Sequence, residues 1–268
     1  MQNDKINFSL IIPIGLMLFS FFFGAGNLIF PPVLGQMAGD NIGWGMLGFC
    51  LSGVGFPLLG VLAMAMKQSD NPDSIAMPMH PLYARAVTIL CALAIGPLFA
   101  IPRTAAVSFD TGIHSLLPAS CEAIGLPVYT VFFFVLTYFF SINPSKIIGH
   151  IGKFLSPMLL ICLAVLVVCV FVNPTGSLKM PNPDFAATPF FRGFQEGYNT
   201  MDLLAAILFG SITIKAIEAQ GITDKKVLTK LCSYAGLIAA FFLAIIYAAL
   251  AYTGALSINV FGVIPNGA

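Results

Sequence analysis

The sequence predicts an all-α polytopic membrane protein, and three observations lead to that fold class. Hydrophobic residues make up 58% of the 268 residues and charged residues only 9%, against about 25% charged residues in a typical soluble domain. Long intervals without charge recur along the chain, and each approaches the roughly 20 apolar residues that a transmembrane helix needs. These intervals do not alternate apolar and polar residues, as the strands of a membrane barrel do. We therefore expect a helical bundle that forms a single membrane domain, residues 1–268.

Seven intervals are long and apolar enough to be predicted as spans. In chain order they are 8–37, 42–66, 83–113, 124–142, 147–172, 191–217 and 228–256. The segments between them are polar and rich in turn residues, as in KQSDNPDS at 67–74, which is a loop composition. The first interval is longer than the roughly 7–15 apolar residues of a signal peptide, so we expect a retained first span.

The Lys and Arg residues predict the orientation of the spans, because they concentrate in cytoplasmic loops. A cytoplasmic N-terminus places nine of them inside: Lys5, Lys67, Arg85, Lys146, Lys153, Lys215, Lys225, Lys226 and Lys230. Lys179 and Arg192 then face out, and Arg103 lies within a span. This bias predicts a multi-pass protein with its N-terminus inside. The net charge of +1 excludes a broad basic surface for nucleic acid.

The stretch SFFFGAGNLIFPP, residues 20–32, interrupts the first span. Gly24 and Gly26 can leave helical geometry at little cost, and Pro31 and Pro32 fit only if a second helix starts near Asn27. Unwound backbone in hydrocarbon is tolerated only where it lines a polar cavity. Its free N–H groups attract an anion and its free carbonyls suit a cation, as a zwitterionic amino acid with Na⁺ would provide. Close helix packing at small residues is the alternative explanation.

A second interruption, FQEGYNTMDLLAAILFG at 194–210, lies in the sixth span. Its most informative residue is Asp202, because a carboxylate at membrane depth is costly and usually functional. A position of Asp202 near the outer interface is the alternative. Interrupted spans at positions one and six are the pattern of a carrier built from inverted five-helix repeats, which binds its substrate between the two breaks.

Arg103, in IPRTAAVSFD at 101–110, places a cation in the third span, and Asp110 follows on about the same helix face. Both are candidate elements of a gate that closes the outer path. The alternative is a structural role for Arg103, either in an ion pair or in bonds to the carbonyls of a broken helix. Pro97 and Pro102 predict a kink in this span.

These same stretches resemble the bacterial branched-chain amino acid:cation symporters, and the similarity covers nearly the whole chain. The matching segments are FFFGAGNLIFPPVLG (21–35), GPLFAIPRTAAVSF (96–109), INPSKIIGHIGKFLSP (142–157) and GFQEGYNTMDLLAAILFG (193–210). The family belongs to the amino acid–polyamine–cation superfamily, so the resemblance implies a LeuT-type inverted-repeat helical bundle. Residues 8–172 would then form the first five-helix repeat and residues 191–256 the first two helices of the second, with the remainder absent.

The resemblance implies a secondary transporter that imports leucine, isoleucine and valine by Na⁺ symport across the bacterial inner (plasma) membrane. The substrate-binding residues that it implies are Gly24, Ala25, Gly26, Asn27, Tyr198, Asn199, Thr200 and Asp202. The implied Na⁺ ligands are Ala25, Asn27 and Thr200, whose neutral oxygens suit a hard cation. Na⁺ is the coupling ion, no other cofactor is implied, and no obligate protein partner is inferred besides the lipid bilayer.

Several alternatives stay open at this point. The family has more spans than this sequence, so we expect a truncated chain, and an inactive fragment of such a transporter is one alternative. A carrier for another small amino acid is a second, and an H⁺-coupled carrier, with the proton on Asp202, is a third. A channel would need a ring of like residues that the sequence does not supply. Neither HExxH nor GxSxG is present, and we expect no enzyme.

Overall fold

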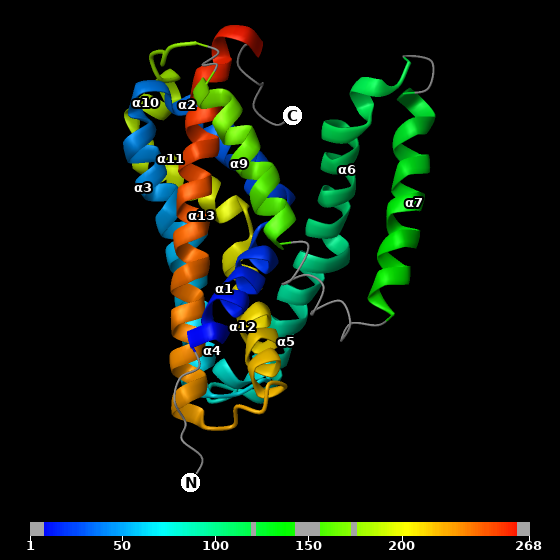
Figure 1. The fold of residues 1–268 in the computed structure, drawn as a ribbon, viewed down its shortest axis with the longest axis vertical. Helices are drawn as coiled ribbons and strands as arrows, with labels where there is room; N and C mark the ends of the chain where they lie inside the picture. Colours follow the sequence, from blue (N-terminus) through cyan, green and yellow to red (C-terminus); the bar gives the residue numbers. More distant parts are fainter. Residues whose placement is uncertain (1–7, 119–121, 143–155, 173–175, 262–268) are drawn as a thin grey trace.

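The computed structural model describes residues 8–118, 122–142, 156–172 and 176–261 (Figure 1), and every regular element in these ranges is a helix. Four helical stretches there are long and apolar enough to cross a membrane: Ala25–Lys67, Pro81–Gly112, Ile124–Ser141 and Lys225–Ile258. A fifth candidate is the bent pair Pro189–Asn199 and Asp202–Glu218, whose halves differ in direction by 46°. The prediction of an all-α polytopic membrane protein is thus confirmed.

The first predicted span consists of two helices, α1 (Phe8–Phe22) and α2 (Ala25–Ala38). At the break, Gly24 has an extended backbone, with φ −118° and ψ −169°. The helix α2 begins at Ala25, two residues before the predicted start near Asn27, and Pro31 and Pro32 lie inside it rather than in its first turn. Backbone contact with α13 (Lys225–Phe261) occurs at this point, since a Cβ on Gly254 would overlap the backbone of Pro32. Neighbouring helices of this kind allow proline within a span.

The chain reverses direction at Gly39, whose φ of +47° favours glycine. A short 3-10 turn, Gly39–Asn41, leads into α3 (Ile42–Cys50), a π-helical turn and α4 (Phe56–Lys67). Figure 1 shows α2 rising to the upper end and α3 and α4 running back to the lower end. The helical stretch Ala25–Lys67 therefore contains the end of the first predicted span and the whole of the second.

The third predicted span is also interrupted. Its helices α5 (Pro81–Leu93) and α6 (Ala100–Gly112) are joined by a π-helical turn. Gly96 (ψ −115°) and Phe99 (φ −134°) depart from helical dihedrals there. The kink predicted at Pro97 is thus a local loss of helical geometry.

The next two predicted spans correspond to α7 (Glu122–Ser141) and α9 (Ser156–Val172). α7 packs beside α6, and Figure 1 shows this pair standing to one side of the other helices. Residues 147–155, which begin the fifth predicted span, and with them Lys153, lie outside the described residues, as do Lys5 and Lys146. Their predicted position on the cytoplasmic side stays a prediction.

The sixth predicted span contains α11 (Pro189–Asn199), which follows the short α10 (Pro183–Ala187), and then α12 (Asp202–Glu218). Between these two halves Met201 adopts a left-handed conformation with φ +66°, which is uncommon for a residue other than glycine. The break predicted from sequence is therefore a sharp change of backbone direction directly before Asp202.

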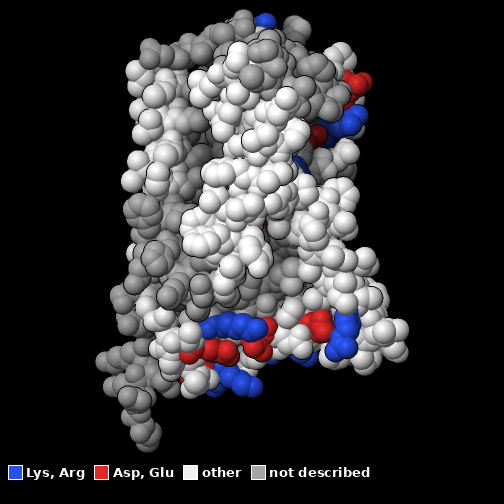
Figure 2. All heavy atoms as spheres, turned by 90° about the vertical axis from the view of Figure 1, so that its right-hand side faces the viewer, with Lys and Arg blue, Asp and Glu red and all other residues white. Residues whose placement is uncertain are grey.

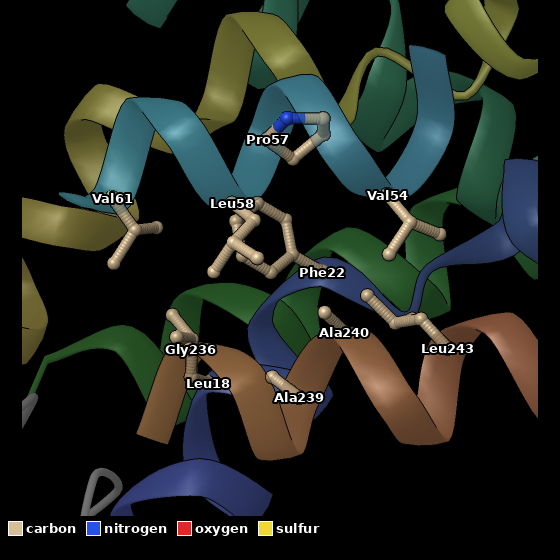
Figure 3. A pocket seen from close by; sticks show the side chains of 10 residues that line it. All are labelled: Leu18, Phe22, Val54, Pro57, Leu58, Val61, Gly236, Ala239, Ala240 and Leu243. Atoms are coloured by element: carbon tan, nitrogen blue, oxygen red, sulfur yellow. The ribbon is translucent and has the colours of Figure 1, made fainter. Parts of the chain in front are cut away.

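The long helix α13 runs along the bundle and contacts α1, α2, α3 and α4. Its apolar face packs against α1 and α4, and Figure 3 shows Leu18, Leu58 and Ala239 facing one another there. The space left between them is only about 10 Å³, hardly room for one water. Close packing at this contact holds the two halves of the chain together.

On the face shown in Figure 2, the larger group of charged side chains lies at the lower end and a smaller group lies at the upper right. Two ion pairs join α5 and α12 to the segment that follows α4: Arg85 with Asp73 at 4.0 Å and Lys215 with Asp70 at 3.7 Å. These residues flank the ends of helices rather than their middles, as expected for a loop region in water.

Candidate functional site

A pocket of about 170 Å³ lies where three interrupted helices meet. The break between α1 and α2, the break between α11 and α12, and the irregular stretch of the third span all contribute to its wall. Its polar lining residues are Asn27, Arg103, Thr104, Thr200 and Asp202. Helix ends with free backbone groups and charged side chains therefore surround a space inside an otherwise apolar bundle.

Asn27 links the first break to the second. Its side chain is 1% exposed, and its Oδ1 accepts a hydrogen bond of 3.0 Å from the backbone N–H of Gly24. Its Nδ2 donates a bond of 2.7 Å to Oδ2 of Asp202. The carboxamide thus stabilises the start of α2 and ties it to α12.

Asp202 is the first residue of α12 and is 4% exposed. The N-terminal end of a helix favours a carboxylate, because the helix dipole is positive there. The backbone N–H of Asp202 donates to Oγ1 of Thr200 at 3.5 Å, and this hydroxyl donates to the carbonyl of Gly197 at 2.8 Å. A buried carboxylate needs hydrogen-bond partners, and the burial of Asp202 means that its side chain does not reach out to solvent. The depth of Asp202 in the membrane stays a prediction.

Tyr247, in α13, completes this network and was not predicted from the sequence. Its hydroxyl accepts a hydrogen bond from Nδ2 of Asn27 and donates one of 3.1 Å to Oδ2 of Asp202. The side chain is fully buried, stacked on Phe23 and edge-on to Phe49. A hydroxyl within a long apolar run needs a polar partner. This was the one feature of the sequence that could have pointed to Tyr247.

Arg103 of α6 binds the C-terminal end of α11. Its guanidinium donates to the carbonyl oxygens of Asn199 (3.1 Å) and Thr200 (3.5 Å), groups that the helix leaves unsatisfied. It lies 5.4 Å from the ring centre of Phe30, within the range of a cation–π contact. A Cβ on Gly26 would come within 2.7 Å of Nη2, so the glycine makes room for the guanidinium.

The structure thus places Arg103 in bonds to broken-helix carbonyls, which was the structural alternative to a gate. Asp110 is exposed, and in the described part of the chain it forms no ion pair with Arg103. A gate built on these two residues together is not supported.

The predicted substrate-binding residues divide into two groups. Gly24, Ala25, Gly26, Asn27, Thr200 and Asp202 all line the pocket. The Tyr198 side chain is 47% exposed and is not in the lining. Asn199 offers its carbonyl to Arg103, while its side chain donates to Glu196 at 3.4 Å. The structure does not bring these two side chains to the pocket.

The predicted Na⁺ ligands can be compared with the oxygens that are present. Oγ1 of Thr200, Oδ1 of Asn27 and the Asp202 carboxylate lie at or beside the pocket wall, and oxygen donors of this kind suit a hard cation. In the described ranges no group of three or more His, Cys, Asp or Glu residues could hold a metal. The assignment of Ala25, Asn27 and Thr200 as Na⁺ ligands stays a prediction.

One side of the pocket is apolar. Phe21 and Phe209 lie there with ring centres 5.5 Å apart, beside Ile95 and Ala205. An apolar cavity of about 150 Å³ can hold a benzene molecule, so a pocket of about 170 Å³ is on the scale of a small organic ligand. The arrangement offers polar groups for a charged end and an apolar surface for a hydrocarbon end.

Comparison with known proteins identifies a family and several relatives. A family model described as branched-chain amino acid transport protein matches residues 8–268. The chain is 45% identical over 267 residues to the branched-chain amino acid permease BrnQ of Bacillus subtilis, covering 100% of this chain and 61% of the relative. It is 44% identical over 257 residues to the permease BraB of the same organism, covering 96% of this chain and 58% of the relative.

A more distant relative is the branched-chain amino acid transport system 3 carrier protein of Pseudomonas aeruginosa. It is 38% identical over 258 residues, which cover 96% of this chain and 58% of that protein. The chain thus spans 58% to 61% of the length of these relatives. No solved structure matches the chain, so the LeuT-type repeat and the division at residues 8–172 and 191–256 stay predictions.

Proposed function

The chain belongs to the branched-chain amino acid transport protein family, and on this premise we propose that it carries the substrate site of a secondary transporter for leucine, isoleucine and valine. Its relatives are named as permeases and carriers, not as enzymes. The observation that carries the proposal is the pocket between two broken helices, with Asp202 and Arg103 in its wall.

The two ends of an amino acid fit different parts of this pocket. The first turn of α2, at Ala25 and Gly26, presents backbone N–H groups and the positive end of the helix dipole, which suit the carboxylate. Asp202 offers negative charge to the ammonium group. The apolar surface formed by Phe21, Phe209 and Ala205 suits a branched hydrocarbon side chain.

We propose Na⁺ as the coupling ion, held by oxygens of Ala25, Asn27 and Thr200 beside the substrate. A proton is the second candidate, favoured by the buried carboxylic acid of Asp202. The two differ in which ion gradient drives uptake, and the structure offers oxygen donors for the first and an acid for the second.

The proposed location is the bacterial inner membrane, with the N-terminus in the cytoplasm. Figure 1 shows α4, α5 and α12 at the lower end, and these helices carry Lys67, Arg85 and Lys215, all of which the distribution of Lys and Arg assigns to the inside. Cysteine accessibility to an impermeant reagent, at position 70 against position 184, would test this orientation.

Uptake by proteoliposomes tests the function directly. The purified chain is reconstituted, and entry of labelled leucine is measured with an inward Na⁺ gradient at fixed pH, then with an inward H⁺ gradient without Na⁺. Saturable uptake driven by Na⁺ supports the proposal. Uptake driven only by H⁺ supports the second candidate, and non-saturable entry or none contradicts a carrier.

A further inference from the structure

Two side chains, Asn27 and Tyr247, donate hydrogen bonds to the same oxygen of Asp202. Nδ2 of Asn27 and the hydroxyl of Tyr247 both donate to Oδ2, at 2.7 Å and 3.1 Å. Oδ1 receives neither of these bonds, although Asp202 lines the pocket. These two donors therefore fix the carboxylate at Oδ2, and Oδ1 lies outside their hydrogen bonds.

The three groups form a closed triangle, because Nδ2 of Asn27 also donates to the hydroxyl of Tyr247. The hydroxyl uses its single proton on Asp202 and accepts from Asn27, so its direction is fixed. Tyr247 itself does not line the pocket. It reaches the site only through Asn27 and Asp202, from the helix behind them.

The ring of Tyr247 is fixed as firmly as its hydroxyl. Its centre lies 6.3 Å from that of Phe23, next to the first break, and 5.2 Å from that of Phe49 in α3. Because the side chain is 0% exposed, it has no room to change rotamer without moving these neighbours. The hydroxyl is thus held at a defined point between the two broken spans.

We propose that Tyr247 is a positioning residue for recognition of the substrate's ammonium group. It holds Asp202 by Oδ2 and so directs Oδ1 toward the pocket, where Oδ1 accepts a charge-assisted hydrogen bond from the ammonium. This inference rests on the proposed function, since it names the group of the amino acid that the network serves. It predicts that Tyr247 affects ammonium recognition more than it affects binding of the rest of the molecule.

The test uses two ligands with one carbon skeleton, leucine and its ammonium-free analogue 4-methylpentanoate. Their affinities for the purified full chain are measured by competition with labelled leucine, for the wild type and for Tyr247→Phe. This change removes only the hydroxyl and keeps the ring between Phe23 and Phe49. Tyr234→Phe is the matched control, because Tyr234 lies on the same helix but is 45% exposed.

We expect Y247F to lower the preference for leucine over the analogue by about tenfold, which corresponds to ~1.4 kcal/mol, while Y234F leaves the preference unchanged. A purely structural defect would weaken both ligands alike, so an unchanged preference overturns the inference. If 4-methylpentanoate does not displace labelled leucine from any variant, the affinities for leucine alone are compared. A tenfold loss of leucine affinity in Y247F then supports the inference, and a leucine affinity equal to that of Y234F overturns it.

A second variant guards against a failure of Y247F to fold. Asn27→Ala removes the other donor to Oδ2 and is expected to lower the same preference, and an unchanged preference in this variant also overturns the inference. The proposed function fails separately, if the wild-type chain binds no leucine at all.

Discussion

The side chains of Asn27 and Asp202 are joined by a hydrogen bond of 2.7 Å across 175 residues of sequence. This bond connects the start of α2 with the start of α12, so that both helix breaks face the same space. Neither residue could be buried alone without loss of stability, because an unpaired amide or carboxylate in an apolar interior is costly. The pair therefore defines where the two broken spans meet.

The first prediction concerns the charge of Asp202. Asp202→Asn keeps the shape of the side chain and removes the negative charge, so leucine affinity should fall by tenfold or more, as expected for the loss of a hydrogen bond between charged groups. The melting temperature without ligand should stay level or rise, because a buried charge opposes folding. Equilibrium binding of labelled leucine and thermal unfolding measure the two effects.

Asp184→Asn is the control, since Asp184 is exposed at the start of α10. Binding by D202N within twofold of the wild type would show that the carboxylate has no part in recognition.

The second prediction concerns Arg103. Arg103→Gln removes the cation that satisfies the carbonyls of Asn199 and Thr200, and we expect a loss of about 1–3 kcal/mol in unfolding free energy. Arg103→Lys should recover only part of this loss, because an ammonium cannot reproduce the planar fork of donors. Thermal unfolding in detergent measures the difference.

Arg192→Gln serves as the reference variant, because Arg192 is exposed on α11. If R103Q retained wild-type stability together with wild-type uptake, then neither a structural role nor a gate role would remain for Arg103.

The third prediction concerns the apolar side of the pocket. Ala205 is 4% exposed and lies one turn after Asp202, so Ala205→Val should reduce the space for the substrate's side chain. Leucine and isoleucine should lose about tenfold in affinity, and valine, which is one methylene smaller, about threefold, in line with the ~1–3 kcal/mol that a methylene contributes in a tight pocket. Competition binding with the three amino acids gives the ranking.

Ala219→Leu, at the exposed end of α12, is the control for a general effect on this helix. An equal loss for all three ligands in A205V would place the substrate's side chain elsewhere.

The fourth prediction concerns the contact between α3 and α11. A Cβ on Gly48 would lie 2.8 Å from the backbone nitrogen of Phe194, so Gly48→Ala should force the helices apart and cost about 1–3 kcal/mol. Gly43→Ala, on the same helix with nothing within 4 Å, should be neutral or stabilising. Equal melting temperatures of the two variants would contradict the close contact.

The sequence was most informative where local chemistry alone determines the structure. Gly24, Gly26 and the polar run before Asp202 predicted both breaks, because glycine and polar groups disfavour a continuous apolar helix. The third interruption was expected only as a proline kink, and its backbone geometry at Gly96 and Phe99 was not predicted. A sequence does not show which neighbour satisfies the freed carbonyls.

The parts that the sequence could not predict depend on which side chains meet in space. Tyr247 belongs to an apolar helix, and its partners lie 220 and 45 residues away. Tyr198, in contrast, stands within the predicted break but points outward, because the helix α11 turns that face away from the pocket. The sequence therefore predicted where both breaks lie along the chain, but it did not predict the direction in which each side chain within them points.

The measurement that tests the central claim most directly is a structure of the chain with leucine and Na⁺ bound in a lipid nanodisc. Ligand density should lie between residues 24–27 and residues 200–205, with its ammonium group next to Asp202 and its side chain toward Phe209. Density at another site, or unbroken α-helix through residues 22–27 and 199–202, would contradict the account.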